Sequence, residues 1–293
     1  MIQRILITAL ILIFPFLARA EYILLGVVEE TNQAPDSIAA RVLFSKMNNK
    51  WQILNTEQSQ DKLDISKVTW TLAFDGKSLG KITTINNYEL KYPDCTWCFH
   101  RDKYFRVEDK SKFPKLGNKE KRFSDWSYQP STRPIVIVNK PFYKDHEKWK
   151  RYRPNLDVLK VLFPILKEKI GQAYHCEGPP KWDAKEIDLK INDVKFFRSY
   201  RNNKGQMLVS AGIIEEHIKN CDGPTDKTQE PMWFFISSDT KFVGFELDLL
   251  DAADYDNDGD IEFIFSHSGY NRDGYTLYES DFNERYDYYW SYH

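Results

Sequence analysis

Short runs of β-branched and aromatic residues, separated by turn residues, recur along most of the chain and constrain its fold more than any other feature. In residues 70–85, WTLAFDGKSLGKITTI, the pair Asp75-Gly76 lies between two such runs and favours a tight hairpin turn. In residues 40–55, ARVLFSKMNNKWQILN, the pair Asn48-Asn49 has the same position. We therefore expect residues 21–90 to form a small antiparallel β domain.

The clearest helical pattern lies in residues 153–171, RPNLDVLKVLFPILKEKIG. Asn155 can cap the start of the helix, apolar residues recur on a broad face, and Gly171 can end it. Pro164 lies in the middle, which leaves open one kinked helix or two short helices. Six strand-like segments follow up to residue 282, and their spacing predicts a β-meander.

The N-terminal residues 1–20, MIQRILITALILIFPFLARA, have the pattern of a secretory signal peptide. A basic start at Arg4 precedes a short apolar run, and Ala18-Arg19-Ala20 fits the small-x-small cleavage rule. The apolar run is shorter than the ~20 residues of a spanning helix, so we expect cleavage after Ala20 rather than a membrane anchor. The sequence therefore predicts an exported protein, periplasmic or secreted.

Residues 91–152 form a basic, loop-rich connector in this interpretation, with one strand expected in RPIVIVNKP, residues 133–141. Residues 101–153 hold 16 Lys/Arg against 7 Asp/Glu, whereas residues 222–293 hold 4 against 17. Because the protein is expected to be exported, nucleic acid is excluded as the partner of the basic stretch. We expect the stretch to form a solvated surface or to pack against the acidic C-terminal part.

The fold class that follows is α+β and mostly β, with a small N-terminal antiparallel β domain and a C-terminal β-meander domain that has a short helical lead-in. The aromatic content of 15% excludes a disordered chain. The predicted segments are a signal peptide at 1–20, a small β domain at 21–90, a connector at 91–152 and an α+β domain at 153–293.

Four cysteines fit an oxidising compartment. Cys95 and Cys98 form a C-x-x-C pair, and Cys176 and Cys221 lie in loop-like contexts farther along the chain. Sequence spacing does not decide among the three possible pairings. The loop-like contexts of Cys176 and Cys221, which flank strand-like sequence, favour Cys176–Cys221, and Cys95–Cys98 would then close a small local loop. A redox-active pair at Cys95 and Cys98, or a zinc site with His100, remains open.

The stretch DYDNDGDIEF, Asp254 to Phe263, places four aspartates and one glutamate within nine residues. Alternating acidic positions in a tight loop turn their carboxylates toward one point, and Gly259 permits the sharp turn. Calcium takes six to eight oxygen ligands, so the stretch predicts a Ca²⁺ site with these residues: Asp254, Asp256, Asp258, Asp260 and Glu262. A solvated acidic turn and a magnesium site are the alternatives.

The residue that follows this stretch at position 12 is Phe265, where an EF-hand has its bidentate glutamate. The pattern D-x-D-x-D-G-x-x-[D/E] followed by a hydrophobic strand instead resembles the calcium loop of FG-GAP repeats, over residues 254–265. This resemblance implies an ion in a strand-to-strand hairpin. It also implies side-chain ligands from Asp254, Asp256, Asp258 and Glu262, with the carbonyl of Asp260.

The function that these features favour is that of an exported calcium-binding protein, a non-catalytic accessory or binding module whose ion stabilises a β-hairpin. The alternative is a secreted hydrolase with catalytic carboxylates that no motif reveals. The aromatic tail FNERYDYYWSYH, residues 282–293, could stack on sugars or pack into the core. A protein or a polysaccharide is therefore a possible partner.

Overall fold

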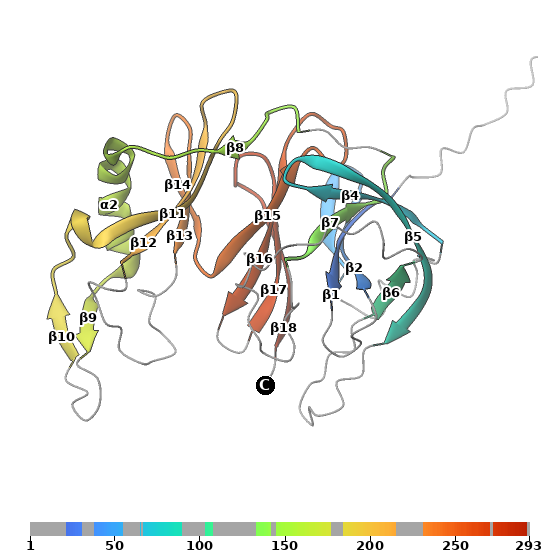
Figure 1. Ribbon diagram of the computed structural model, residues 1–293, viewed down its shortest axis with the longest axis horizontal. Coiled ribbons are helices and arrows are strands. Elements are labelled where there is room, and N and C mark those ends of the chain that lie inside the picture. The colour runs from blue at the N-terminus through green and yellow to red at the C-terminus, as the bar shows by residue number, and fades with distance from the viewer. Residues whose placement is uncertain are drawn as a thin grey trace, which may run out of the picture.

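The structure is a computed structural model, and it describes residues 22–30, 38–54, 65, 67–89, 103–107, 133–141, 145–176, 184–214, 231–269 and 272–291. Within these residues the protein is mostly β, with several antiparallel sheets and one α-helix, which confirms the predicted fold class. Figure 1 shows a curved β unit at one end, a central sheet, and a second sheet that carries the helix at the other end.

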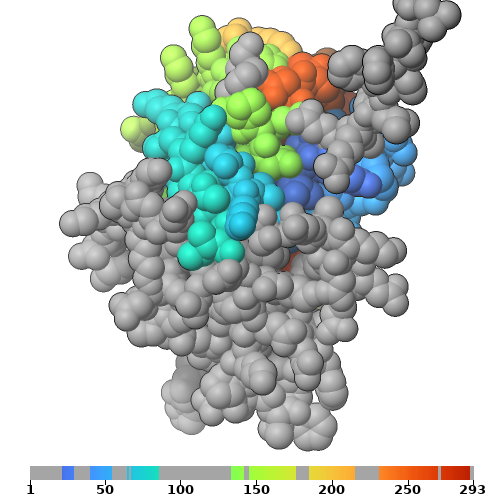
Figure 2. Space-filling view, turned by 90° about the vertical axis from the view of Figure 1, so that its right-hand side faces the viewer, coloured from blue at the N-terminus to red at the C-terminus, as the bar shows by residue number. Residues whose placement is uncertain are grey.

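The N-terminal unit is a closed β barrel. Antiparallel pairs connect the strands in the order β1-β7-β4-β5-β6-β2, and β2 pairs with β1 again, so the ring has no free edge there. β3 extends β2 outside the ring. Figure 2 shows β7, in green, between the cyan strands β4 and β5 and the blue strands β1 and β2. The strands are β1 (Ile23–Glu30), β2 (Ile38–Met47), β3 (Lys50–Ile53), β4 (Thr69–Phe74), β5 (Lys77–Glu89), β6 (Lys103–Val107) and β7 (Ile135–Val138).

Both predicted hairpin turns are present. Asn48 and Asn49 have φ of 52° and 59° and connect β2 to β3, and Asp75 and Gly76 have φ of 50° and 68° and connect β4 to β5. Positive φ at both central residues is the type I′ geometry, which Asn, Asp and Gly tolerate best. The local sequence therefore specifies these two turns.

The barrel takes in strands from the expected connector. The predicted strand in residues 133–141 is confirmed as β7, but it is not isolated, because it pairs with β1 and with β4. β6 likewise pairs with β5 and β2. The sheet thus continues past residue 90, since pairing between distant strands leaves no signal in local composition.

The second unit is a five-stranded sheet in the order β14-β13-β12-β11-β8, with a helix on one face. A two-stranded sheet of β9 and β10 lies beside the helix. The elements are β8 (Lys150–Arg151), α2 (Leu156–Ile170), β9 (Ala173–Cys176), β10 (Ala184–Ile187), the 3₁₀ helix η3 (Ile191–Asp193), β11 (Val194–Arg201), β12 (Met207–Ile213), β13 (Met232–Ile236) and β14 (Thr240–Gly244).

Helix α2 begins and ends as the sequence predicts. The Asn155 side chain accepts a hydrogen bond from the Val158 amide at 3.2 Å, and the Gly171 amide donates to the Lys167 carbonyl. Pro164 lies inside one continuous helix, so the two-helix alternative is wrong. Leu159, Leu162 and the rest of the apolar face pack on the five-stranded sheet. In the described part of the chain, no helix is long and apolar enough to cross a membrane.

The expected single meander is divided into two sheets. A second meander contains β15 (Leu247–Ala253), β16 (Glu262–Gly269), β17 (Arg272–Tyr278) and β18 (Arg285–Ser291). The break falls between β14 and β15, where Glu246 has a φ of 58°. A positive φ at a non-glycine residue ends regular pairing, so β14 and β15 belong to different sheets.

The β15–β18 sheet is buried on both faces. Ile264, Tyr275 and Leu277 pack with residues of the barrel, whereas Phe263 and Phe265 pack with residues of the β8–β14 sheet. Tyr288 and Trp290 of the aromatic tail also lie in the core toward the barrel, 2% and 5% exposed, which favours core packing for these two rings. Two-sided burial explains why apolar residues occupy consecutive rather than alternating positions in these strands.

A buried polar network crosses the contact between the barrel and the central sheet. Arg41 of β2 pairs with Glu29 of β1 at 3.2 Å, and the Tyr275 hydroxyl of β17 donates to the same carboxylate. The Arg41 guanidinium lies 4.1 Å from the ring centroid of Trp290. Because buried charges need partners, this network fixes the position of the barrel on the sheet.

We expect Leu277→Ala to reduce the free energy of unfolding by about 2–5 kcal/mol, because Leu277 is fully buried between the barrel and the central sheet. Urea unfolding monitored by far-ultraviolet circular dichroism measures the change. Val161→Ala on the exposed face of α2 is the control, with a change within about 0.5 kcal/mol. Equal effects of the two substitutions would contradict the two-sided packing.

Candidate metal centre

The acidic loop connects β15 to β16, and Ala253 and Glu262 are the last residue pair before it. The predicted stretch therefore lies in a β-hairpin, and no helix follows it. Gly259 has a φ of 103°, and Asn257 also has a positive φ of 65°. Glycine is the residue that adopts such a conformation without steric cost, so its place in the loop has a backbone reason.

Three of the predicted side chains converge. Asp254, Asp256 and Glu262 each offer a carboxylate oxygen, and these oxygens all lie within 4.8 Å of one another. Asp254 and Glu262 are 4% and 1% exposed. Calcium–oxygen bonds are ~2.3–2.6 Å long, so ligands on opposite sides of one ion lie about 5 Å apart. The three oxygens are therefore close enough to bind a single ion.

Backbone amides of the loop hold these carboxylates in place. Asp254 accepts hydrogen bonds from the Asp258 amide at 3.1 Å and from the Gly259 amide at 3.2 Å. Glu262 accepts from the Tyr255 amide at 2.9 Å. Each carboxylate oxygen has two acceptor positions, so these bonds leave capacity for a cation.

Lys46 of β2 in the barrel extends its ammonium group to the same loop. It donates to Asp258 at 2.7 Å and forms an ion pair with Asp256. Burial alone would lower the pKa of Lys46, but the hydrogen bonds and charges of the two aspartates outweigh it, so the pKa is raised. The sequence gives no sign of this contact, because 210 residues separate Lys46 from Asp256.

The net pKa shifts of the acidic residues differ in direction, although burial acts to raise each of them. Burial raises the pKa of Glu262 well above the usual range, and the charge of Asp256 adds to the shift. It also raises the pKa of Asp256, against the effect of Lys46. For Asp258, burial is outweighed by hydrogen bonds from Lys46 and the Asp260 amide, so its pKa is lowered. The positive charge near Glu262 and Asp256 is thus too small to offset the burial of their carboxylates.

Asp258 and Asp260 lie outside the converging group. The Asp258 carboxylate points toward Lys46 and accepts from the Asp260 amide at 2.9 Å. The Asp260 side chain is exposed and lies 3.5 Å from the Ser280 hydroxyl. The role of the Asp260 carbonyl as a ligand, which the resemblance implies, stays a prediction.

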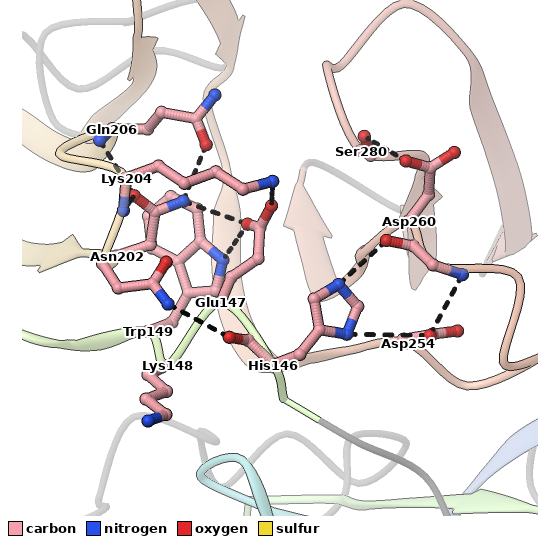
Figure 3. Close-up of polar contacts among 12 residues, drawn as sticks. His146, Glu147, Lys148, Trp149, Asn202, Lys204, Gln206, Asp254, Asp260 and Ser280 are labelled. Carbon is pink, nitrogen blue, oxygen red and sulfur yellow. Dashed lines mark hydrogen bonds and ion pairs between the residues drawn. The ribbon is translucent and has the colours of Figure 1, made fainter.

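His146 is a residue of this centre that the sequence does not reveal. Its Nε2 lies 2.8 Å from the Gly259 carbonyl oxygen, and its Nδ1 lies 3.7 Å from an Asp254 oxygen. Figure 3 shows the ring between Asp254 and the peptide group that precedes Asp260. The Gly259 contact requires a proton on Nε2, so His146 donates to the loop and fixes its sharp turn.

The segment that carries His146 is itself held by Glu147. This carboxylate accepts hydrogen bonds from Trp149 and Asn202, both at 3.0 Å, and pairs with Lys204 at 2.6 Å. Asn202 in turn accepts from the Gln206 amide at 2.9 Å in the β11–β12 turn (Figure 3). Two contacts thus hold the acidic loop in place: His146, from the segment before β8, and Lys46, from the barrel.

The donor set fits a hard divalent cation. Oxygen ligands from carboxylates are those that calcium and magnesium prefer. The carboxylates of Asp254, Asp256, Asp258 and Glu262 carry four negative charges when ionised, and Lys46 supplies one positive charge. A divalent ion would balance most of the remainder, so the residues present suit such a group.

The predicted disulfides cannot be placed in the same way. Cys95, Cys98 and Cys221 lie outside the described residues, as does His100. Cys176 ends β9, where its backbone pairs with Ala184. The pairings Cys95–Cys98 and Cys176–Cys221 stay predictions.

Asp251 connects the loop to the barrel. Its carboxylate accepts from the Tyr255 hydroxyl at 2.9 Å and from the Gly76 amide of the β4–β5 turn at 2.8 Å. Burial raises the pKa of Asp251 to about 6, against the opposing effect of these hydrogen bonds. The protonated form is therefore favoured in the folded state more than in the unfolded chain.

Comparisons of the chain with models of protein families, with curated proteins and with solved structures give no match.

We expect Asp251→Asn to change the pH dependence of stability. A folded-state pKa near 6, above the unfolded value of ~3.9, adds stability at low pH that is lost as the pH rises through 6. The free energy of unfolding of the wild-type protein should fall by about 2–3 kcal/mol relative to the variant between pH ~4 and ~7. Urea unfolding across this range measures the difference.

Asp248→Asn is the control for this experiment, because Asp248 lies on the same strand with a side chain that is 23% exposed. Its profile should stay parallel to that of the wild-type protein. A parallel profile for Asp251→Asn as well would refute the raised pKa.

Proposed function

We propose that this chain is an exported calcium-binding protein in which the ion stabilises the β15–β16 hairpin. The observation that supports it best is the convergence of Asp254, Asp256 and Glu262, whose oxygens lie within 4.8 Å of one another. The FG-GAP-like order of ligands in the same loop supports calcium over magnesium, which prefers octahedral sites that keep several waters.

The role of the ion in this proposal is structural. The loop contacts the barrel through Lys46 and the segment before β8 through His146, so an ion that orders the loop would also strengthen both contacts. Binding to the folded state alone raises stability by mass action. The protein would then act as a non-catalytic accessory or binding module, whose ligand is a separate question.

Export belongs to the same proposal. The signal-like pattern of residues 1–20 directs the chain to a compartment in which calcium is abundant and cysteines are oxidised. Extracellular modules bind calcium with dissociation constants of about 10⁻⁴–10⁻³ M. A loop whose carboxylates are already partly neutralised by Lys46 of β2 suits an affinity in that range.

We expect calcium to raise the melting temperature relative to a chelator, and Glu262→Gln to abolish the rise. At a calcium concentration of about 100 times the dissociation constant, linkage predicts ~2.7 kcal/mol of added stability, or about 5–10 °C for a domain of this size. Differential scanning calorimetry with calcium, magnesium and EDTA measures the shift. Larger stabilisation by magnesium would change the assigned ion.

Asp260→Asn is the matched control for Glu262→Gln. It removes a charge from the same loop but keeps the backbone carbonyl, so the calcium-dependent rise should persist. An unchanged melting temperature of the wild-type protein over a wide range of calcium concentrations would eliminate the metal centre.

We expect Lys46→Met to lower stability in EDTA and to tighten calcium binding. Loss of the ammonium leaves Asp256 and Asp258 uncompensated, at a cost of about 1–3 kcal/mol. The Asp256 side chain is 1% exposed and carries most of this cost, whereas Asp258, at 44% exposed, is screened by solvent. Removal of the competing charge should increase calcium affinity by about tenfold, measured by isothermal titration calorimetry. Weaker binding would show instead that Lys46 organises the site. Lys50→Met at the exposed start of β3 is the control.

A further inference from the structure

A pocket of about 230 Å³ lies where the barrel, the central sheet and the β8–β14 sheet meet. The barrel contributes Asp75, Gly76 and Arg133, and β15 contributes residues 249–252. The remaining walls come from β11, from β8 and from the segment that leads into β8: Asp145, Trp149, Lys150, Arg151 and Tyr200. Pockets for drug-sized ligands occupy ~300–1,000 Å³, so this one suits a smaller molecule.

The acidic groups of the pocket gather around the β4–β5 turn. Asp251 accepts from the Gly76 amide at 2.8 Å, and Asp145 packs so close to Gly76 that a Cβ there would lie 2.9 Å from its carboxylate. Asp75 is the neighbouring turn residue, with a side chain that is 60% exposed. This end of the pocket therefore offers hydrogen-bond acceptors and negative charge.

The three basic side chains of the pocket differ in whether they already have a carboxylate partner within the protein. Arg133 donates to Asp75 at 2.8 Å and also to the Leu250 carbonyl, so it holds the barrel turn against β15. Lys150 and Arg151 have no carboxylate partner within the part of the chain that the structure describes. Arg151 lies 4.7 Å above the ring of Tyr200, which orients its guanidinium along the pocket wall. The edge of β8 thus supplies donors and positive charge.

We propose that this pocket binds a small zwitterion of the amino-acid type, with its carboxylate at Lys150 and Arg151 and its ammonium at Asp75 and Asp145. The guanidinium of Arg151 presents paired donors that match a carboxylate. An ammonium group at the other end would contact the exposed carboxylate of Asp75 and the half-buried carboxylate of Asp145. Burial raises the pKa of Asp145, so a cation at this position would be favourable.

The pocket holds three carboxylates, and a pair of carboxylates in one pocket is also the arrangement of glycoside hydrolases. In this pocket, however, both oxygens of Asp251 accept hydrogen bonds within the protein, and the residue is 3% exposed. A catalytic carboxyl needs an oxygen directed at the substrate, so Asp251 is unsuited to that role. Asp75 is paired with Arg133 at 2.8 Å, and Asp145 accepts from the Lys148 amide at 2.6 Å, so the geometry favours binding over hydrolysis. The proposal does not depend on the calcium centre, because none of the proposed ligand contacts is a residue of the acidic loop.

The test is a calorimetric titration of the purified protein with each of the protein L-amino acids. At least one should bind saturably with a dissociation constant below about 1 mM. Its N-acetyl derivative, which lacks the ammonium, and its amide, which lacks the carboxylate, should each bind at least tenfold more weakly. The absence of saturable binding for every amino acid at about 10 mM would overturn the proposal. Equal binding of the N-acetyl derivative or of glucuronate would indicate a plain anion site and also overturn it.

Two substitutions locate the binding in the pocket. Arg151→Gln removes the cation, and Asp75→Asn removes an anion but keeps the hairpin, because Asn-Gly favours the same type I′ turn. Each should weaken binding by about tenfold or more without changing the near-ultraviolet circular dichroism spectrum. Arg153→Gln and Asp239→Asn, which lie outside the pocket, should bind as the wild-type protein does. Unchanged affinity in both pocket variants would place the ligand elsewhere and overturn the proposal. Hydrolysis of a glycoside that either substitution abolishes would show that the pocket is a catalytic site, and it would also overturn the proposal.

Discussion

The burial of the β15–β18 sheet on both faces is the interaction on which the rest of the structure depends. One face packs against the barrel and the other against the β8–β14 sheet, so apolar side chains leave water on both sides of the same strands. Neither neighbouring unit would cover its own inner surface without this sheet. Figure 1 accordingly shows the sheet in the centre, with the barrel on one side and the unit that carries the helix on the other.

The same arrangement gives the acidic loop its surroundings. A loop at the end of a central hairpin lies within reach of both neighbours, and this is why Lys46 of the barrel and His146 of the segment before β8 meet in it. Burial of an ionised carboxylate costs free energy unless a positive charge compensates it. The same position that allows the two contacts therefore also makes it costly to leave the carboxylates of the loop uncompensated. Lys46 compensates part of the negative charge of these carboxylates, and a calcium ion would compensate most of the remainder.

Sequence reasoning was accurate where a feature is local. The turns at Asn48-Asn49 and Asp75-Gly76 follow from the φ preferences of those residues, and the caps of α2 follow from one side chain and one glycine. It was incomplete where pairing is distant. β7 joins the barrel through strands more than 60 residues earlier, and the break at Glu246 divides an apolar segment that reads as one strand. Periodicity carries no information on which strand a given edge will meet.

The sequence by itself determined the elements and the composition of the acidic loop: mostly β structure, a capped helix, and alternating carboxylates between two strands. The tertiary structure decided which of them converge, because Asp258 turns to Lys46 whereas Asp254, Asp256 and Glu262 come together. It also created the mixed-charge pocket, whose walls come from three units. The physical reason is that a side chain's local conformation depends on its neighbours in sequence, whereas its charge environment depends on packing between distant strands.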